Sequence, residues 1–424
     1  MDRYVTRVRM DKAGLWSRGG PRLPHLDIEL TERCNNNCLH CYINRPAGDE
    51  KARRQEMSAA RVGEILCEAA SLGCLGVRFT GGEPLLRDDF EEIYLFARKL
   101  GMKITIFTNA TLIRPRIADL LSRIPPLAPL EITLYGMTRK SYEAVTRTRN
   151  SFGKAMAGID RLLERKVPFV VKGAFLPPNA GEIPAFEAWA KTVPWMDKPP
   201  SFSIFHVLHA RGDRSKNRVI KSVRPGPETG VKVLTRDPGA YLKDLRMFLR
   251  TFAGKRDERL FTCGAGMDTC SVDAYGRLQP CLLVRHPETV YDLSGGSLKD
   301  ALDNFFPVLR KRKAANRSYL ERCARCPLRG FCEQCPGNSW MEDGTLDGPV
   351  DYFCEVAHVQ AKVLGLLKGG ERAWEIADWE KRLDGFSEAD ARKRLENLGG
   401  MNAPSFDETQ THKGGPDGST GRSG

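Results

Sequence analysis

The arrangement of cysteines constrains this chain of 424 residues more than any other feature, because 11 of its 13 cysteines fall into two widely separated groups. The first group is Cys34, Cys38 and Cys41, and the second is Cys263, Cys270, Cys281, Cys323, Cys326, Cys332, Cys335 and Cys354. Clustered thiols with no apolar stretch of about 20 residues indicate metal or redox chemistry in a reducing compartment. We therefore predict a cytoplasmic protein with two metal-bearing regions, in which Cys67 and Cys74 are small core side chains.

Between the two groups, strand-like and helix-like segments alternate. Strands are predicted at 26–31, 76–80, 103–108, 130–135, 169–175 and 202–208, with helices at 58–72, 88–100, 114–122, 140–146, 152–166 and 183–192. Six such units predict an α/β protein with a parallel sheet, in the form of a partial (β/α)6 TIM-like barrel. A doubly wound sheet is the alternative that the same alternation allows.

The polar motifs of this region all follow predicted strands. Cys34 to Cys41 come after the first strand, Gly81 to Pro84 after the second, and Thr108 and Asn109 end the third. In either architecture, the carboxyl ends of parallel strands meet at one edge and form the binding site. The sequence therefore predicts one site built from these three segments.

Three thiolates suit a four-iron cluster that keeps one iron open for a small molecule. A zinc site is the alternative; it needs a fourth protein ligand, and His40 is the local candidate. The string from Cys34 to Tyr42 resembles the CxxxCxxC loop of radical S-adenosylmethionine (SAM) enzymes, and Gly81-Gly82-Glu83-Pro84 resembles their GGEP motif. The resemblance covers about residues 26 to 210.

The resemblance implies a [4Fe–4S] cluster on Cys34, Cys38 and Cys41, with SAM bound beside it. The implied cofactor-binding residues are His40, Tyr42, Gly81, Gly82, Glu83, Pro84, Thr108, Asn109, Thr133 and Arg147. Glu83 would accept from the amino group of SAM, the two glycines would expose their amides, and Arg147 would pair with the carboxylate. The main chain at Tyr42 would contact adenine, and Asn109 or Thr133 the ribose or methionine end. Reductive cleavage would then yield a 5′-deoxyadenosyl radical that abstracts a hydrogen atom.

The eight later cysteines resemble the SPASM domain of radical SAM enzymes that modify peptides and proteins. The resemblance implies two auxiliary [4Fe–4S] clusters, which would accept the electron released from the substrate radical. One is assigned to Cys263, Cys270, Cys281 and Cys335, and the other to Cys323, Cys326, Cys332 and Cys354. Because only two residues separate Cys332 from Cys335, these two assignments are exchangeable. Paired CxxC units alone would also suit zinc.

The implied reaction is oxidation or crosslinking of a peptide or small protein. Sulfatase maturation ranks low because Leu282 stands where those enzymes carry an aspartate after the cysteine. A porphyrin-type or other small-molecule substrate is the first alternative, and a non-catalytic iron–sulfur electron-transfer protein is the second. The catalytic residue is unassigned, with four unranked candidates: His206, His209, Tyr135 and Asp273.

Charge gives weaker guidance about partners. The formal net charge is +13, and the basic segments 211–224 and 310–313 are candidates for attracting an acidic peptide. The 25 residues before the first strand are too few for a leader-binding domain, so a separate leader-binding protein is expected, together with a flavodoxin or ferredoxin as reductant. Neither a membrane nor a nucleic-acid partner is expected.

The predicted organisation follows these segments. We expect an extension at 1–25, a radical SAM barrel at 26–215, a linker with a helix at 216–259, a SPASM domain at 260–360, a helical region at 361–398 and a disordered tail at 399–424. Residues 211–227 are predicted to be loop-like, and the helix of the linker is predicted at 240–252.

Overall fold

The computed structural model describes residues 23–43, 45–208, 214–252 and 258–399. The tail predicted at 399–424, apart from Gly399, and most of the predicted amino-terminal extension lie outside the described residues. No helix among the described residues has both the length and the apolar character that a membrane crossing requires.

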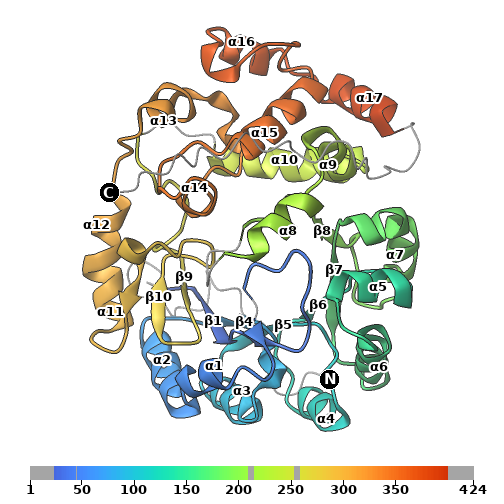
Figure 1. Ribbon diagram of the computed structural model, residues 1–424, viewed down its shortest axis with the longest axis vertical. Helices are drawn as coiled ribbons and strands as arrows, with labels where there is room; N and C mark the ends of the chain where they lie inside the picture. Colours follow the sequence, from blue (N-terminus) through green and yellow to red (C-terminus); the bar gives the residue numbers. More distant parts are fainter. Residues whose placement is uncertain (1–22, 44, 209–213, 253–257, 400–424) are drawn as a thin grey trace, which may run out of the picture.

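Six parallel strands in chain order form the centre of the fold (Figure 1). They are β1 (His25–Thr31), β4 (Gly76–Gly81), β5 (Lys103–Thr108), β6 (Leu130–Thr133), β7 (Phe169–Ala174) and β8 (Ser201–Ser203). Each pairs with the next, while β1 and β8 do not pair with each other. The predicted α/β fold with an open parallel sheet is confirmed, although the last strand is shorter than the predicted 202–208.

Helices connect these strands and cover the outside of the sheet, as crossover connections between parallel strands require. They are α1 (Glu50–Gln55), α2 (Ala59–Ser71), α3 (Phe90–Lys99), α4 (Pro115–Arg123), α5 (Arg139–Thr146), α6 (Ser151–Glu164) and α7 (Ile183–Ala190). The predicted Ser58 cap is present, because its side chain accepts from the amide of Arg61. Helix and strand positions therefore agree with the sequence periodicity to within a few residues.

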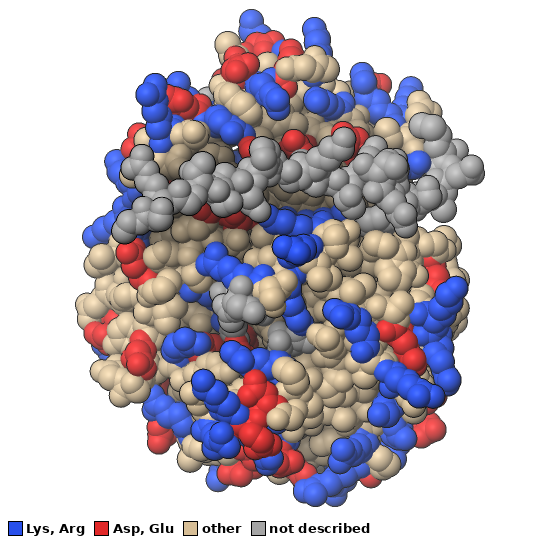
Figure 2. Space-filling view, in the orientation of Figure 1, with Lys and Arg blue, Asp and Glu red and all other residues tan. Residues whose placement is uncertain are grey.

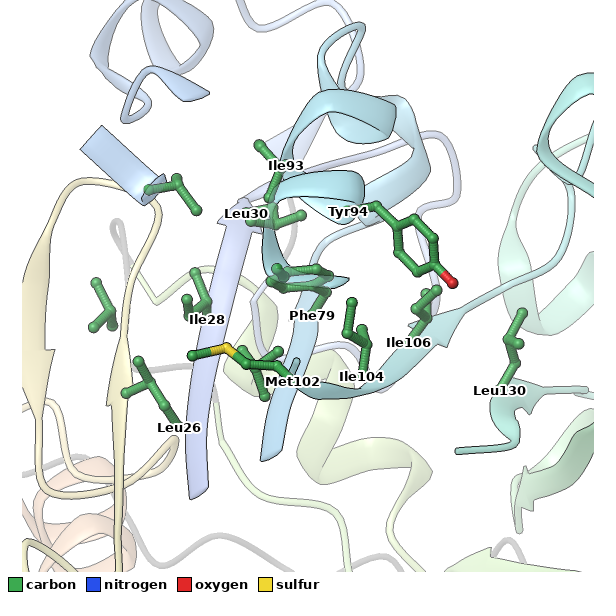
Figure 3. Close-up of a cluster of buried hydrophobic side chains, with 14 of the residues drawn as sticks. Leu26, Ile28, Leu30, Phe79, Ile93, Tyr94, Met102, Ile104, Ile106 and Leu130 are labelled. Atoms are coloured by element: carbon green, nitrogen blue, oxygen red, sulfur yellow. The ribbon is translucent and has the colours of Figure 1, made fainter. Parts of the chain in front are cut away.

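The core between sheet and helices is apolar and closely packed. Figure 3 shows Ile28 and Leu30 of β1, Phe79 of β4 and Ile106 of β5 in one cluster with Tyr94 of α3, whose ring points toward Ile106. All five are fully buried. Burying such side chains stabilises a fold by about 1.5–3 kcal/mol each, so this packing fixes the carboxyl ends of the strands in place.

The cysteine-rich segment begins by extending the same sheet. β9 (Thr269–Val272) pairs in parallel with the outer edge of β1, and β10 (Arg277–Gln279) and β11 (Tyr291–Asp292) follow antiparallel. The remaining α-helices of five or more residues come before or after this hairpin along the chain. They are α8 (Lys216–Val223), α9 (Pro227–Leu234), α10 (Pro238–Phe252), α12 (Phe306–Arg310), α13 (Arg317–Glu321), α14 (Pro336–Asp343), α15 (Asp351–Val363), α16 (Trp379–Asp384) and α17 (Glu388–Gly399). The prediction of a loop at 211–227 was wrong, since α8 lies within it; Ile220 and Val223 supply its buried face.

Candidate functional site

The loop that carries Cys34, Cys38 and Cys41 leaves the carboxyl end of β1 and is fixed by main-chain contacts. The amide of Asn37 donates to the carbonyl of Thr146 (2.9 Å), and that of Leu39 donates to the carbonyl of Val145 (3.0 Å). Both acceptors lie in the last turn of α5, whose carbonyls have no partner within the helix. The loop therefore has a fixed position against the barrel.

The three thiols of this loop are close neighbours. Burial raises the pKa of Cys34 to about 12, and that of Cys38 is raised by burial and then by the charges of Cys41 and Cys34. A hydrogen bond with Tyr135 acts in the opposite direction on Cys38. Thiols in such surroundings ionise only with a compensating cation, so binding of a metal here would release protons.

Glu83 lies at the centre of the site and is fully buried. Its carboxylate accepts from the hydroxyl of Thr108 (2.8 Å), the amide of Asn109 (2.8 Å) and the amide of Leu85 (3.2 Å). Burial raises the pKa of Glu83 to about 7, although the three donors favour the charged form. The motif after β4 is thereby joined to the end of β5.

Gly81 and Gly82 are required by close backbone packing. Gly81 has φ +120°, and a Cβ on Gly82 would lie 2.2 Å from the carbonyl oxygen of Arg33. The amide of Gly82 donates to the carbonyl of Thr31 (2.7 Å) and that of Glu83 to Arg33 (2.9 Å). The expectation that the Gly82 amide is exposed to a ligand was therefore wrong, because this amide fixes the turn to the end of β1. Pro84 starts the short 3-10 turn that follows.

Asn109 connects the turn after β5 to the cysteine loop. Its side-chain nitrogen donates to Asn35 Oδ1 (3.0 Å) and lies 3.8 Å from the sulfur of Cys34. Asn35 in turn donates to Thr111 (2.7 Å). The three predicted segments thus meet at one edge of the sheet.

Aromatic rings form the other wall of this site. The ring of His40 lies 5.1 Å from that of Tyr135 and 5.0 Å from that of His206. His206 contacts the carbonyl of Phe175 through Nε2 (3.0 Å), while His40 Nδ1 is buried without a hydrogen-bond partner. Burial lowers the pKa of His40 well below its usual range, so its ring is neutral. His40 is therefore a wall residue with an unused nitrogen.

Of the remaining predicted contacts, Tyr42 lies near Cys41 and Glu29, whose charges act on its phenol. Thr133 ends β6 and pairs with Lys172 of β7. Arg147 is exposed and left-handed (φ 52°), at the end of α5. Its main chain adjoins the cysteine loop, but no contact joins its side chain to the group around Glu83.

A second group of cysteines forms around the turn after β10. Burial is the largest cause that raises the pKa of Cys335, and the charges of Cys281 and Cys263 raise it further. The amide of Gly266 donates to the carbonyl of Pro280 (2.9 Å), which brings the Cys263 turn to Cys281. Cys335 caps α14 and accepts from the amide of Asn338. Three of the four cysteines assigned to the first auxiliary cluster are therefore together.

Cys270 occupies a different environment. It lies on β9 opposite Leu26 and is fully buried in the apolar core. Burial raises its pKa, followed by the charges of Cys74 and Asp27, whereas none of the other three assigned cysteines acts on it. The structure thus places Cys270 with the predicted core residue Cys74, away from its assigned partners. Alternation along β9 is the physical reason, because Cys270 points into the core on a strand paired with β1.

The third group is Cys323, Cys326, Cys332 and Cys354. Burial is the largest cause that raises the pKa of Cys332. The charges of Cys326, Cys354 and Cys323 raise it further. Arg322 Nη2 lies 3.9 Å from the sulfur of Cys354 on α15. Cys332 therefore lies with this group and Cys335 with the other, as first assigned.

The donor sets fit iron–sulfur clusters in type. Each group supplies three or four thiols, the ligands that these clusters use, and the first group lies beside polar side chains that suit a small polar cofactor. Within the described residues, no three of the side chains converge as the ligands of a single metal ion would.

Residues 28–185 match the Radical SAM superfamily. The matched residues include the loop of Cys34 to Cys41, Glu83 and Asn109. They end before the cysteine-rich segment begins.

Among curated proteins similar to this chain, Fe-coproporphyrin III synthase of Methanosarcina barkeri is 25% identical, over 74% of this chain and 85% of that protein. The antilisterial bacteriocin subtilosin biosynthesis protein AlbA of Bacillus subtilis is 22% identical, over 73% of this chain and 66% of that protein. The chain spans less than half the length of several other curated relatives that it matches. The crystal structure of Streptococcus suis SuiB bound to S-adenosylmethionine has a similar fold, with a TM-score of 0.57 and 18% identity, over 77% of this chain and 76% of that one.

Two residues near the first cysteine loop were missed by sequence reasoning. The charge of Lys216, at the start of α8, acts on Cys38, His40 and Cys41. Arg285 forms a buried ion pair with Glu29 of β1. The basic run around Lys216 was visible in the sequence, but nothing there showed that α8 returns to the site; Arg285 had no local signal at all.

The four candidate catalytic residues separate clearly. Tyr135 and His206 lie beside the cysteine loop, whereas Asp273 is fully buried in the β9–β10 turn and accepts from the amides of Tyr275 and Arg277 (both 3.0 Å). His209 lies outside the described residues. Asp273 is thus held within this turn.

The basic segments are mostly paired internally. Arg224 is buried against Glu342 (2.6 Å), Arg310 donates to the carbonyl of Cys263 (2.7 Å), and Lys313 pairs with Glu258. Arg211 lies outside the described residues. Figure 2 shows Lys and Arg interspersed with Asp and Glu over most of the visible face. The described parts of these segments therefore serve mainly as structural partners.

Proposed function

We propose that this protein cleaves SAM reductively and uses the resulting 5′-deoxyadenosyl radical to abstract hydrogen from a substrate. One observation supports this more than any other: Cys38 is influenced by Cys34 and Cys41, and Cys34 by buried Glu83, within the residues that match the Radical SAM superfamily. A [4Fe–4S] cluster on these thiols would supply the electron that breaks the sulfur–carbon bond of SAM.

The chain's own residues bind and orient in this proposal. Cys34, Cys38 and Cys41 hold the cluster, and Glu83, which has two oxygens and a pKa near neutrality, accepts from the amino group of SAM. His40 and Tyr135 form an aromatic wall that excludes water. Asn109 and Thr108 keep Glu83 in position, and Pro84 and the two glycines fix its turn.

The experiment is anaerobic incubation of reconstituted protein with SAM and dithionite. Release of 5′-deoxyadenosine is expected from the wild type and not from the triple variant Cys34→Ala/Cys38→Ala/Cys41→Ala. Cys67→Ala, an exposed cysteine on α2, is the matched control and should behave like the wild type. Equal release from wild type and triple variant would refute the site. A protein that cycles electrons without releasing 5′-deoxyadenosine would instead be an electron-transfer protein.

The proposed substrate is a peptide or small protein, in line with the cysteine-rich extension and with the relative AlbA, whose name places it in bacteriocin biosynthesis. In this proposal, Cys323, Cys326, Cys332 and Cys354 hold one auxiliary cluster, while Cys263, Cys281 and Cys335 hold the other. These clusters would accept the electron from the substrate radical.

A porphyrin-type substrate is the second candidate. It is favoured by Fe-coproporphyrin III synthase, which matches at higher identity and over more of its own length than AlbA does. Mass spectrometry separates the two candidates after anaerobic turnover. Loss of hydrogen or of carboxyl groups from coproporphyrin supports the second, and a mass change in a peptide encoded beside this gene supports the first.

A further inference from the structure

Arg285 is a buried cation with donors that the described residues leave unused. Its side chain is 6% exposed, and Nη2 donates to Glu29 Oε1. Nε and Nη1 are buried without a hydrogen-bond partner. A buried guanidinium donor without an acceptor costs about 1–3 kcal/mol, so such donors indicate a ligand that supplies the acceptor.

The position of Arg285 is between the two cysteine sites. It follows Cys281 by four residues, and its charge acts on the Cys281 thiol. It also acts on the phenol of Tyr42, which is in turn influenced by Cys41 and Cys281. Glu29 lies opposite Thr80 in the pairing of β1 with β4, just before the Gly81 turn. The guanidinium thus lies at the carboxyl edge of the sheet, where ligands of such folds bind.

We propose that Arg285 is a substrate-binding residue that receives a carboxylate group between the two cysteine sites. This proposal rests on the proposed function and deepens it by naming a chemical group of the substrate. Nη1 and the second hydrogen of Nη2 form one edge of the guanidinium, and this edge matches the two oxygens of a carboxylate.

Glu29 has a positioning role in this arrangement. It accepts from Nη2, which limits rotation of the side chain. The negative charge of Glu29 offsets part of the free-energy cost of burying the guanidinium before the substrate binds. A carboxylate that arrives then finds donors already oriented.

A carboxylate is common to both candidate substrates. Porphyrin propionates carry it, as do the acidic side chains of a peptide. Two matched pairs of probes distinguish these sources: coproporphyrin III against its tetramethyl ester, and a short capped Ala/Gln peptide with a central Glu against the same peptide with Gln. The porphyrin pair differs in four carboxylates, which the ester carries as methyl esters, and the peptide pair differs in one side-chain carboxylate.

The test measures dissociation constants by anaerobic equilibrium dialysis of the reconstituted holoenzyme without SAM. In at least one pair, the wild type should prefer the carboxylate form by about tenfold or more. Arg285→Gln should abolish the preference and Arg285→Lys should retain part of it. Arg116→Gln, an exposed arginine on α4, should retain all of it. Melting temperature and iron content establish that each variant is folded.

Three results would overturn the proposal: no preference in either pair for the wild type, a preference that survives Arg285→Gln, or an Arg285→Gln variant that loses affinity for SAM with its probe preference intact. The last result would assign the donors to the carboxylate of SAM. Because binding is measured without SAM cleavage, a wild type that releases no 5′-deoxyadenosine would contradict the proposed function and leave the carboxylate result to be judged separately.

Discussion

The first cysteine loop and the cysteine-rich segment hold their thiols in different ways. The first loop hydrogen-bonds through its main chain to α5, and its neighbour turn at Gly82 bonds to β1, so the barrel positions it. In the second region, Cys323 begins a 3-10 turn of three residues, and Cys326 directly precedes a 3-10 turn of four residues. The difference teaches that one site is built by the fold, whereas the other depends more on its own ligands for order.

The largest expected effect tests which cysteines belong to the second region. Cys281→Ala should lose about four of about twelve irons, because it removes one of three neighbouring thiols. Cys270→Ala, its matched control on β9, should keep them all, since its neighbours are Cys74 and Asp27. Iron and sulfide analysis after anaerobic reconstitution measures both. A loss of about four irons from Cys270→Ala would return that residue to the cluster.

The second prediction concerns the turn built by the barrel. Gly82→Ala should lower the free energy of unfolding by more than about 3 kcal/mol, because its Cβ would lie 2.2 Å from the Arg33 carbonyl oxygen. Gly48→Ala, which meets no atom within 4 Å, should change it by less than about 1 kcal/mol. Urea unfolding of the apoprotein measures both. Similar values for the two variants would mean that the barrel does not fix this turn.

The third prediction compares the two regions directly. Removal of iron by a chelator should increase amide exchange in residues 323–335 by about 100-fold, while amides in β4 and β5 keep their protection. The reason is that short turns lack the hydrogen-bonded ladder that holds the barrel strands. Hydrogen-exchange mass spectrometry of iron-loaded and iron-free protein measures the effect. Equal protection of both regions without iron would remove the proposed contrast.

The smallest expected effect concerns the buried wall of the barrel site. Burial lowers the pKa of His206 to about 4, and the charge of Arg224 acts in the same direction, against the hydrogen bond to Phe175. The unfolded chain therefore binds more protons than the folded one between about pH 4 and 6.5, so stability is lost as pH falls through that window.

His206→Asn should reduce this acid loss by about 2 kcal/mol between pH 6.5 and 5. Urea unfolding of the apoprotein at both pH values measures the change. His25→Asn, a more exposed histidine at the start of β1, is the control. An unchanged pH dependence in His206→Asn would show that another group controls the acid loss.

Much of the barrel was predictable because its signals are local. The alternation of strands and helices and the Ser58 cap each reflect a few neighbouring residues, and the motifs at Cys34 and Gly81 follow strands whose ends must meet. The strand predicted at 202–208 is shorter in the structure and the helix α8 was missed, because tertiary packing decides both. Ile220 and Val223 gain their buried positions only from contacts with distant elements.

The cysteine-rich segment was less predictable for the same reason. The resemblance grouped Cys323, Cys326, Cys332 and Cys354, which lie together, but the partners it assigned to Cys270 differ from the neighbours in the structure. Pairing of β9 with β1 determines which way Cys270 points, and this pairing joins residues more than 240 positions apart, His25 with Thr269. Arg285 and Glu29 meet across a similar separation.

The pairing of β9 with β1 also bears on how such a protein can be divided. Cutting the chain before β9 would expose the outer edge of β1, where Leu26 and Ile28 are fully buried, as an unpaired strand. An exposed apolar edge recruits other chains, so a truncated barrel should aggregate instead of remaining a working half. The two cysteine regions therefore depend on the same sheet, and any shortened or recombined version of this protein must keep β9, the strand that joins them.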